Sequence, residues 1–108
     1  MNMLFNTDKE YPLNVIIMLS LQRALLCQVP PNLRMVAVDW NEEIEEIVIY
    51  FYFDNKITDE EKEIACDVSG EVSGDFNYDV QIIDKCIYLN KSKTLPQHMC
   101  SIYRRKED

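Results

Sequence analysis

The chain has very little glycine and histidine, and this scarcity excludes most compact catalytic motifs. Its 108 residues include two glycines and one histidine. A phosphate-cradling loop needs several glycines close together, and an HExxH motif needs a second histidine. A GxSxG nucleophile motif is also missing. We therefore expect a protein that is not an enzyme. The one catalytic alternative left open is a small enzyme that uses a cysteine or His98.

Cysteine is present, but not in a pattern that indicates disulfides or metal binding. Cys27, Cys66, Cys86 and Cys100 are widely separated, and no CxxC pair occurs. In a chain long enough to bury its own core, such cysteines indicate buried free thiols rather than a disulfide framework. His98 and Cys100 form an isolated HxC pair, and the spacing of a calcium loop is absent. We expect neither metal nor cofactor.

An uninterrupted apolar run of membrane-spanning length is also missing. The stretch Leu13–Leu26 is strongly apolar, but Gln22 and Arg23 break it well short of the roughly 20 apolar residues that a span requires. A signal peptide needs a positive leader, whereas residues 1–11 contain two acids beside one lysine. We therefore expect a cytoplasmic protein without a membrane partner.

The segment Met35–Asp54 is predicted to form two strands joined by an acidic turn, and the rest of the fold is expected to assemble on it. Side chains in the second strand alternate between Ile47, Ile49, Phe51, Phe53 and Glu46, Val48, Tyr50, Tyr52. The first set is wholly apolar, and the second carries a carboxylate and two phenols. We expect helices to cover the apolar face and the other face to stay partly open.

A first helix is predicted after Pro12, which suits a first helical turn because its missing N–H is not needed there. The following sequence is apolar nearly all round, which indicates a helix buried on more than one side. Val29-Pro30-Pro31 is expected to end this helix, because proline cannot continue one.

A second helix is predicted after Thr58, which forms a capping box with Glu61. An apolar seam at helical spacing follows, consisting of Ile64, Ala65, Val68 and Val72. Gly74 is expected to end the helix as a left-handed cap. Close approach to the sheet would explain Gly70 inside the helix, where glycine costs about 1 kcal/mol against alanine.

Strand-like alternation returns after Phe76. Val80 to Ile82 and Ile87 to Leu89 are predicted strands, with Asp84-Lys85 as a turn or bulge between them, and Met99–Arg104 is predicted as the last strand. The resulting fold is α+β, with two helices packed on one face of a mainly antiparallel four- to five-stranded sheet in the order α-β-β-α-β-β(-β). One domain over residues 1–108 is expected, with a ragged leader at 1–10 and a solvated tail at 104–108.

The net charge of −8 is concentrated in the middle of the chain. Residues 1–40 sum to zero, residues 41–76 to −10 and residues 77–108 to +2. Such an acidic block repels phosphate backbones and anionic membranes, so we expect no nucleic-acid partner. A basic protein is the natural partner. The alternative is that the acids only keep the protein soluble.

Aromatic side chains near this acidic block complete the predicted binding surface, because tryptophan and tyrosine commonly anchor interfaces. Structural roles remain open for them: Trp40 as a lid on the core, and Tyr50 and Tyr52 as cross-strand pairs. The candidate partner-binding residues are Asp39, Trp40, Glu42, Glu43, Glu45, Glu46, Tyr50, Tyr52, Asp59, Glu60, Glu63, Asp67 and Glu71.

Four segments taken together resemble a family of small bacterial immunity proteins. They read LQRALL, VPPNLRMVAVDW, IVIYFYFDNKITDEEKE and SGEVSGDF, and the similarity runs from about Leu19 to Arg105. Members of that family neutralise the toxins of contact-dependent growth inhibition and other polymorphic toxin systems, which are often nucleases that cleave tRNA. The resemblance implies a cytoplasmic inhibitor that binds its cognate toxin as a heterodimer and has no catalytic residues of its own.

One alternative of another class remains. An adaptor that self-associates, or that docks on a basic protein without inhibiting it, would have the same charge distribution. The lack of a toxin-like reading frame directly upstream of the gene would favour it.

Overall fold

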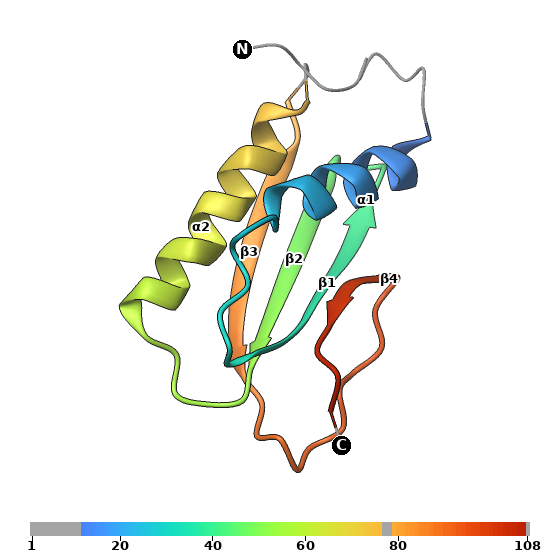
Figure 1. Ribbon diagram of the computed structural model, residues 1–108. Helices are drawn as coiled ribbons and strands as arrows, with labels where there is room; N and C mark the ends of the chain where they lie inside the picture. Colours follow the sequence, from blue (N-terminus) through green and yellow to red (C-terminus); the bar gives the residue numbers. More distant parts are fainter. Residues whose placement is uncertain (1–11, 77–78, 108) are drawn as a thin grey trace.

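The computed structural model describes residues 12–76 and 79–107 (Figure 1). Its elements follow the order α1 (Leu13–Ala24), β1 (Leu33–Asn41), β2 (Glu46–Phe53), α2 (Asp59–Gly74), β3 (Gln81–Tyr88) and β4 (Cys100–Arg104). Both helices lie on the same face of one four-stranded sheet (Figure 1). The predicted α+β class and the placement of the helices are therefore confirmed.

The sheet is mixed, and here the prediction of a mainly antiparallel sheet holds only in part. The strand order is β3-β2-β1-β4. β1 pairs antiparallel with β2 and β4, whereas β2 and β3 run parallel. The parallel pair follows from α2, because a helical crossover returns the chain to its starting end before β3 begins.

The turn or bulge expected at Asp84-Lys85 is wrong. β3 runs without interruption from Gln81 to Tyr88 and keeps an unshifted register with β2. Both polar side chains are exposed because β3 is an edge strand. Polar residues in the middle of an edge strand are therefore compatible with an uninterrupted strand.

The main core lies between the sheet and the two helices, as the alternation in β2 predicts. Ile47, Ile49, Phe51 and Phe53 are each at most 1% exposed. The helices contribute Ile16, Ile17 and Leu21 from α1 and Ala65, Val68 and Val72 from α2. The predicted apolar seam of α2 is thus confirmed, with Ile64 packing at its margin.

The first helix differs from its prediction in burial and in length. α1 ends at Ala24, because the chain then turns through Cys27 in a left-handed conformation, with φ of 64°. Leu19 is 43% exposed and Leu26 is 70% exposed. Among the described residues, α1 is therefore buried on one side only, and the apolar residues of its outer side are left uncovered.

The second helix begins and ends at the predicted residues, but it lacks the predicted left-handed cap. Thr58 and Glu61 form the complete capping box. Gly74 is the last helical residue and has no positive φ; the cap is Asp75 in a right-handed conformation. The Asp75 side chain accepts hydrogen bonds from Ser20 and Arg23 on α1. Close packing does not explain Gly70, because an added Cβ would meet nothing within 4 Å.

All four cysteines are free, as predicted. The prediction that they are buried is wrong. Cys27 and Cys66 are exposed, and Cys86 and Cys100 are half-buried. Burial raises the pKa of the Cys86 thiol.

Candidate interaction surface

The nine predicted acidic residues outside β1 lie on two separate elements. Glu42, Glu43 and Glu45 form the turn between β1 and β2, and Glu46 begins β2. Asp59, Glu60, Glu63, Asp67 and Glu71 lie on α2. All of them except the half-buried Glu46 are exposed. α2 begins at the end of the sheet remote from that turn and runs back toward it (Figure 1). We name the two groups the hairpin acids and the α2 acids.

None of these nine acids takes part in an ion pair within the described residues. The ion pairs found there use Asp39, Asp54, Asp75 and Glu107 instead. The hairpin acids and the α2 acids are therefore not paired with a lysine or arginine in the part of the chain that the structure describes.

Four of the α2 acids form a ridge that opposes helix stability. Glu60, Glu63, Asp67 and Glu71 follow one another at intervals of three or four residues, so they share one side of the helix. Like charges four residues apart each destabilise a helix by about 0.2–0.5 kcal/mol. Glu71 also lies near the C-terminal end of the helix, where the dipole favours cations. A ridge with this cost is better explained by a partner than by helix stability.

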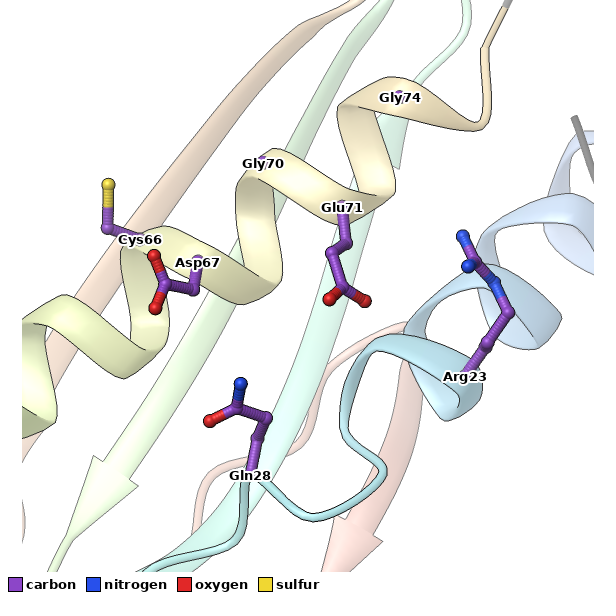
Figure 2. Close-up of a pocket in the computed structure, with 7 residues that line it drawn as sticks. All are labelled: Arg23, Gln28, Cys66, Asp67, Gly70, Glu71 and Gly74. Atoms are coloured by element: carbon purple, nitrogen blue, oxygen red, sulfur yellow. The ribbon is translucent and has the colours of Figure 1, made fainter. Parts of the chain in front are cut away.

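A groove of about 560 Å³ runs between α2 and the end of α1 (Figure 2). Glu71 reaches from α2 toward the end of α1 that carries Arg23, and Gln28 rises from the segment that follows α1 (Figure 2). Arg23 does not neutralise this groove, because its guanidinium donates to both carboxylate oxygens of Asp75. The other residues that line it are Cys66, Asp67, Gly70 and Gly74.

The hairpin acids surround an exposed apolar side chain that the sequence analysis missed. Ile44 is 62% exposed at the tip of the turn. The turn is held by the Glu43 amide, which donates to Asn41 Oδ1 at 3.0 Å, and by Glu45 at a φ of 51°. An apolar residue within a charged rim is the usual anatomy of an interface. The available signal was one isoleucine inside a run of four glutamates.

The segment between β3 and β4 covers part of the remaining sheet face, which was expected to be partly open. Leu89 and Leu95 pack there around the buried Tyr52, whereas Glu46 and Tyr50 stay half-buried. Arg34 is 2% exposed and holds the segment, since its guanidinium donates to the carbonyl oxygens of Leu89, Asn90 and Lys93 at 3.0–3.1 Å. Arg34 also forms a bidentate ion pair with Glu107, in which Nε donates to Oε2 at 2.8 Å and Nη2 donates to Oε1 at 2.9 Å.

The same ion-pair cluster involves the predicted solvated tail. Arg105 donates to Asp54 and to Glu107, and all three side chains are at most 22% exposed. The hydrogen bond from Arg34 lowers the pKa of Glu107 to about 2. Arg105 and Glu107 are therefore part of the folded structure and not a solvated tail.

Asp39, Tyr50 and Tyr52 contact His98, which belongs to this covering segment. His98 Nδ1 lies 2.9 Å from Asp39 Oδ2, and Nε2 lies 2.6 Å from the Tyr52 hydroxyl. The rings of Tyr50 and His98 are 4.2 Å apart. Tyr52 is 5% exposed, so the structure places it in the interior, whereas Tyr50 stays half-buried.

The electrostatics of this cluster follow from burial and hydrogen bonds. Burial opposes ionisation of Asp39, but hydrogen bonds from the Met99 amide and from His98 outweigh it and lower the pKa of Asp39. Burial raises the pKa of Tyr52, and the neighbouring Tyr50 and Asp39 add to this effect. Although the chain Asp39–His98–Tyr52 has the order of a catalytic relay, a buried phenol with a raised pKa is a poor nucleophile.

Trp40 points to the opposite side of the sheet from Asp39. It pairs with Ile47 and packs half-buried against the main core. Its backbone amide donates to Met99 Sδ at 3.3 Å. The structure thus separates the aromatic candidates: Trp40 lies at the edge of the core, while Tyr50 and Tyr52 lie on the far face.

The described residues contain neither a candidate metal site nor a helix of membrane-spanning character. Within residues 12–76 and 79–107, no group of three or more His, Cys, Asp or Glu residues is arranged to hold a metal ion. In the same part of the chain, neither helix is long and apolar enough to cross a membrane.

A small α+β protein with uncompensated acids on one helix and around an apolar turn has the features of a binding protein. The comparison with protein families agrees with this class. The family model described as MafI2 immunity protein matches residues 14–107. Because the match covers most of the sequence, the chain belongs to the MafI2 immunity protein family, and the resemblance noted in the sequence is confirmed. No curated protein matches the chain.

Proposed function

We propose that this immunity protein neutralises a nuclease toxin in the cytoplasm by forming a one-to-one heterodimer through its acidic surface. Membership of the MafI2 immunity protein family supports the binding of a cognate toxin. The observation that carries the finer proposal is the absence of ion pairs at the hairpin acids and the α2 acids, within the described residues.

A nuclease is the toxin class that fits this charge distribution. Its active site must hold phosphates and is therefore lined with lysine and arginine. A surface of exposed carboxylates can imitate the polyanionic substrate and attract such a site over a long range. Electrostatic attraction of this kind raises association rates by one to three orders of magnitude at low ionic strength.

The proposal assigns contact roles to the exposed candidates and structural roles to others. Ile44 supplies an apolar contact among the hairpin acids, because it is exposed at the tip of the turn. Tyr52 and His98 hold the covering segment through their hydrogen bond and take no part in catalysis. The protein acts by occupying the toxin and not by chemistry.

Charge reversal tests the proposal, with the toxin encoded directly upstream as partner, catalytically disabled if it proves toxic. One variant replaces the hairpin acids with lysine, and a second replaces four of the α2 acids with lysine, namely Glu60, Glu63, Asp67 and Glu71. We expect at least one variant to lose tenfold or more in affinity, with a smaller salt dependence. Calorimetry or surface plasmon resonance at two salt concentrations provides the measurement.

The matched control is Asp79→Lys, which reverses an exposed acid outside both groups. It is expected to bind within twofold of the wild type. Unchanged affinity and salt dependence in both charge-reversal variants would rule out the acidic surface as the interface. Failure of the wild type to bind or to protect cells from any upstream toxin would leave the adaptor alternative instead.

A further inference from the structure

As far as the described residues show, the outer edge of β3 carries a regular row of unpaired backbone groups. β3 covers eight residues, pairs with β2 on one side only, and shows no register shift. Two hydrogen bonds define which amides face inward: the Gln81 amide donates to Glu45 O at 2.9 Å and the Leu89 amide to Phe53 O at 2.8 Å.

In a parallel ladder the inward-facing residues alternate with outward-facing ones. Odd-numbered residues from Gln81 to Leu89 therefore bond to β2. The residues that direct both their amide and their carbonyl outward are Ile82, Asp84, Cys86 and Tyr88. No other hydrogen bond within the described residues reaches these outward backbone groups.

Proteins usually protect such an edge with charged side chains, with proline, with a bulge or by keeping the strand short. β4, at the opposite edge, follows this rule, since it covers five residues and its pairing with β1 contains a register shift. β3 has no proline and no bulge, and only Asp84 and Lys85 place charge on it. Asp84 and Lys85 are therefore the only protection of this kind on β3, and they select which strands can pair with its outer edge.

Pairing with a second copy of the chain is opposed by these two charges. In an antiparallel pair, opposite residues share a face of the sheet, so only positions of the same parity can oppose one another. The two self-pairing registers with the greatest overlap therefore centre on Asp84 or on Lys85, and each places that residue opposite its own copy. Like charges directly opposite one another are destabilising.

We propose that an extended segment of the cognate toxin adds to the sheet as a strand beside β3. This inference rests on the proposed function and names a second contact of the same complex. The residues of β3 with outward amides direct their side chains to the helix-bearing face, where Asp84 is exposed and Tyr88 is 54% exposed. The matching toxin strand carries a lysine or arginine beside Asp84 and an apolar side chain beside Tyr88. Main-chain hydrogen bonds supply the affinity and these side chains the specificity.

Amide hydrogen exchange, followed by NMR on the labelled chain with and without the disabled toxin, tests the pairing directly. The outward amides of Ile82, Asp84, Cys86 and Tyr88 are expected to exchange fast in the free protein and at least tenfold more slowly in the complex. The inward amides of Ile83, Lys85 and Ile87 are the internal control and are protected in both states. Outward amides that still exchange fast in a saturated complex would overturn the proposal.

A matched pair of variants at one exposed position separates the contribution of the backbone amide to toxin binding from that of the side-chain charge. Asp84→Pro removes an outward amide that β2 does not use, and edge strands tolerate proline there. Asp84→Ala removes the same charge but keeps the amide. We expect proline to weaken binding of the disabled toxin at least tenfold and alanine less than threefold, with both variants folded by circular dichroism.

An equal loss in the two variants, or no loss in either, would contradict strand addition. A wild type that forms no complex would refute the proposed function and this inference together. A third outcome would overturn the inference but keep the proposed function: charge reversal of the acidic surface abolishes binding, and the outward β3 amides of the wild type still exchange fast in its saturated complex.

Discussion

The charged residues of this protein fall into two regions that are built in opposite ways. In the cluster around Arg34, Arg105 and Glu107, opposite charges meet at short range and join segments far apart in the sequence. The hairpin acids and the α2 acids make no such pair within the described residues. The first region uses charge to hold the fold. The second region repels itself, which is the arrangement expected where a partner supplies the cations.

The largest expected effect comes from Arg34→Met, which removes the centre of the first region. Glu107 and three backbone carbonyls then lose their buried donor. Breaking one side of a buried pair typically costs about 3–5 kcal/mol of unfolding free energy. Urea denaturation measures the loss. Arg104→Met, at an exposed neighbouring arginine, is the control and is expected to change stability by less than about 0.5 kcal/mol.

Glu107→Gln is expected to remove a pH-dependent part of the stability. The pKa of Glu107 is lowered from 4.5 to about 2 in the folded protein. The carboxylate therefore stabilises the fold fully above pH 4.5 and loses that effect as the pH falls to about 2. The expected difference between wild type and variant is about 2–3 kcal/mol at pH 7, and it should shrink across this window. A constant difference from pH 7 to pH 2 would contradict the assignment.

His98→Ala should have a smaller effect and should separate a structural from a catalytic role. The change leaves the Tyr52 hydroxyl without its partner and frees one oxygen of Asp39. The expected loss is about 1–2 kcal/mol in unfolding free energy. Protection of cells against the toxin should persist, with Gln97→Ala as the exposed neighbouring control. Loss of protection in a variant that is still folded would point to chemistry at His98.

The smallest expected effect has the opposite sign and lies in the second region. Asp67→Lys replaces two like-charge pairs, with Glu63 and Glu71, by two attractive pairs. We expect the unfolding free energy to rise by about 1 kcal/mol, while toxin binding weakens. Thermal denaturation and binding measurements on the same variant test this trade-off. If stability rises but affinity does not change, the ridge does not face the toxin.

Local sequence patterns predicted the parts of the fold that local physics determines. The alternation in β2 gave the buried face, and the capping box at Thr58 gave the start of α2. The parallel pairing of β3 could not be derived in the same way, because it depends on where the α2 crossover returns the chain. The end of α2 at Gly74 was predicted, but the contacts of Asp75 with Ser20 and Arg23 on α1 were not, because they join residues more than 50 positions apart.

The sequence predicted the negative charge of the candidate surface, but not how the fold arranges the acidic residues in space. The sequence placed the acids in one block, whereas the fold divides them between a hairpin turn and a helix. Tyr52 was expected on an open face, but Arg34 and Glu107, 73 residues apart, hold the segment that covers it. Contacts of such long range leave no periodic signal. Ile44 was overlooked because one apolar residue in an acidic turn has no pattern of its own.

The contact between Arg23 and Asp75 has a consequence for how the protein meets a partner. It joins the end of α1 to the end of α2, and the Asp75 side chain is 1% exposed. The α2 acids are therefore displayed on a helix whose position is already fixed, with little backbone entropy left to lose on association. A toxin that binds the α2 acids would therefore contact a rigid surface. Its association rate would then be limited by encounter and not by a folding step.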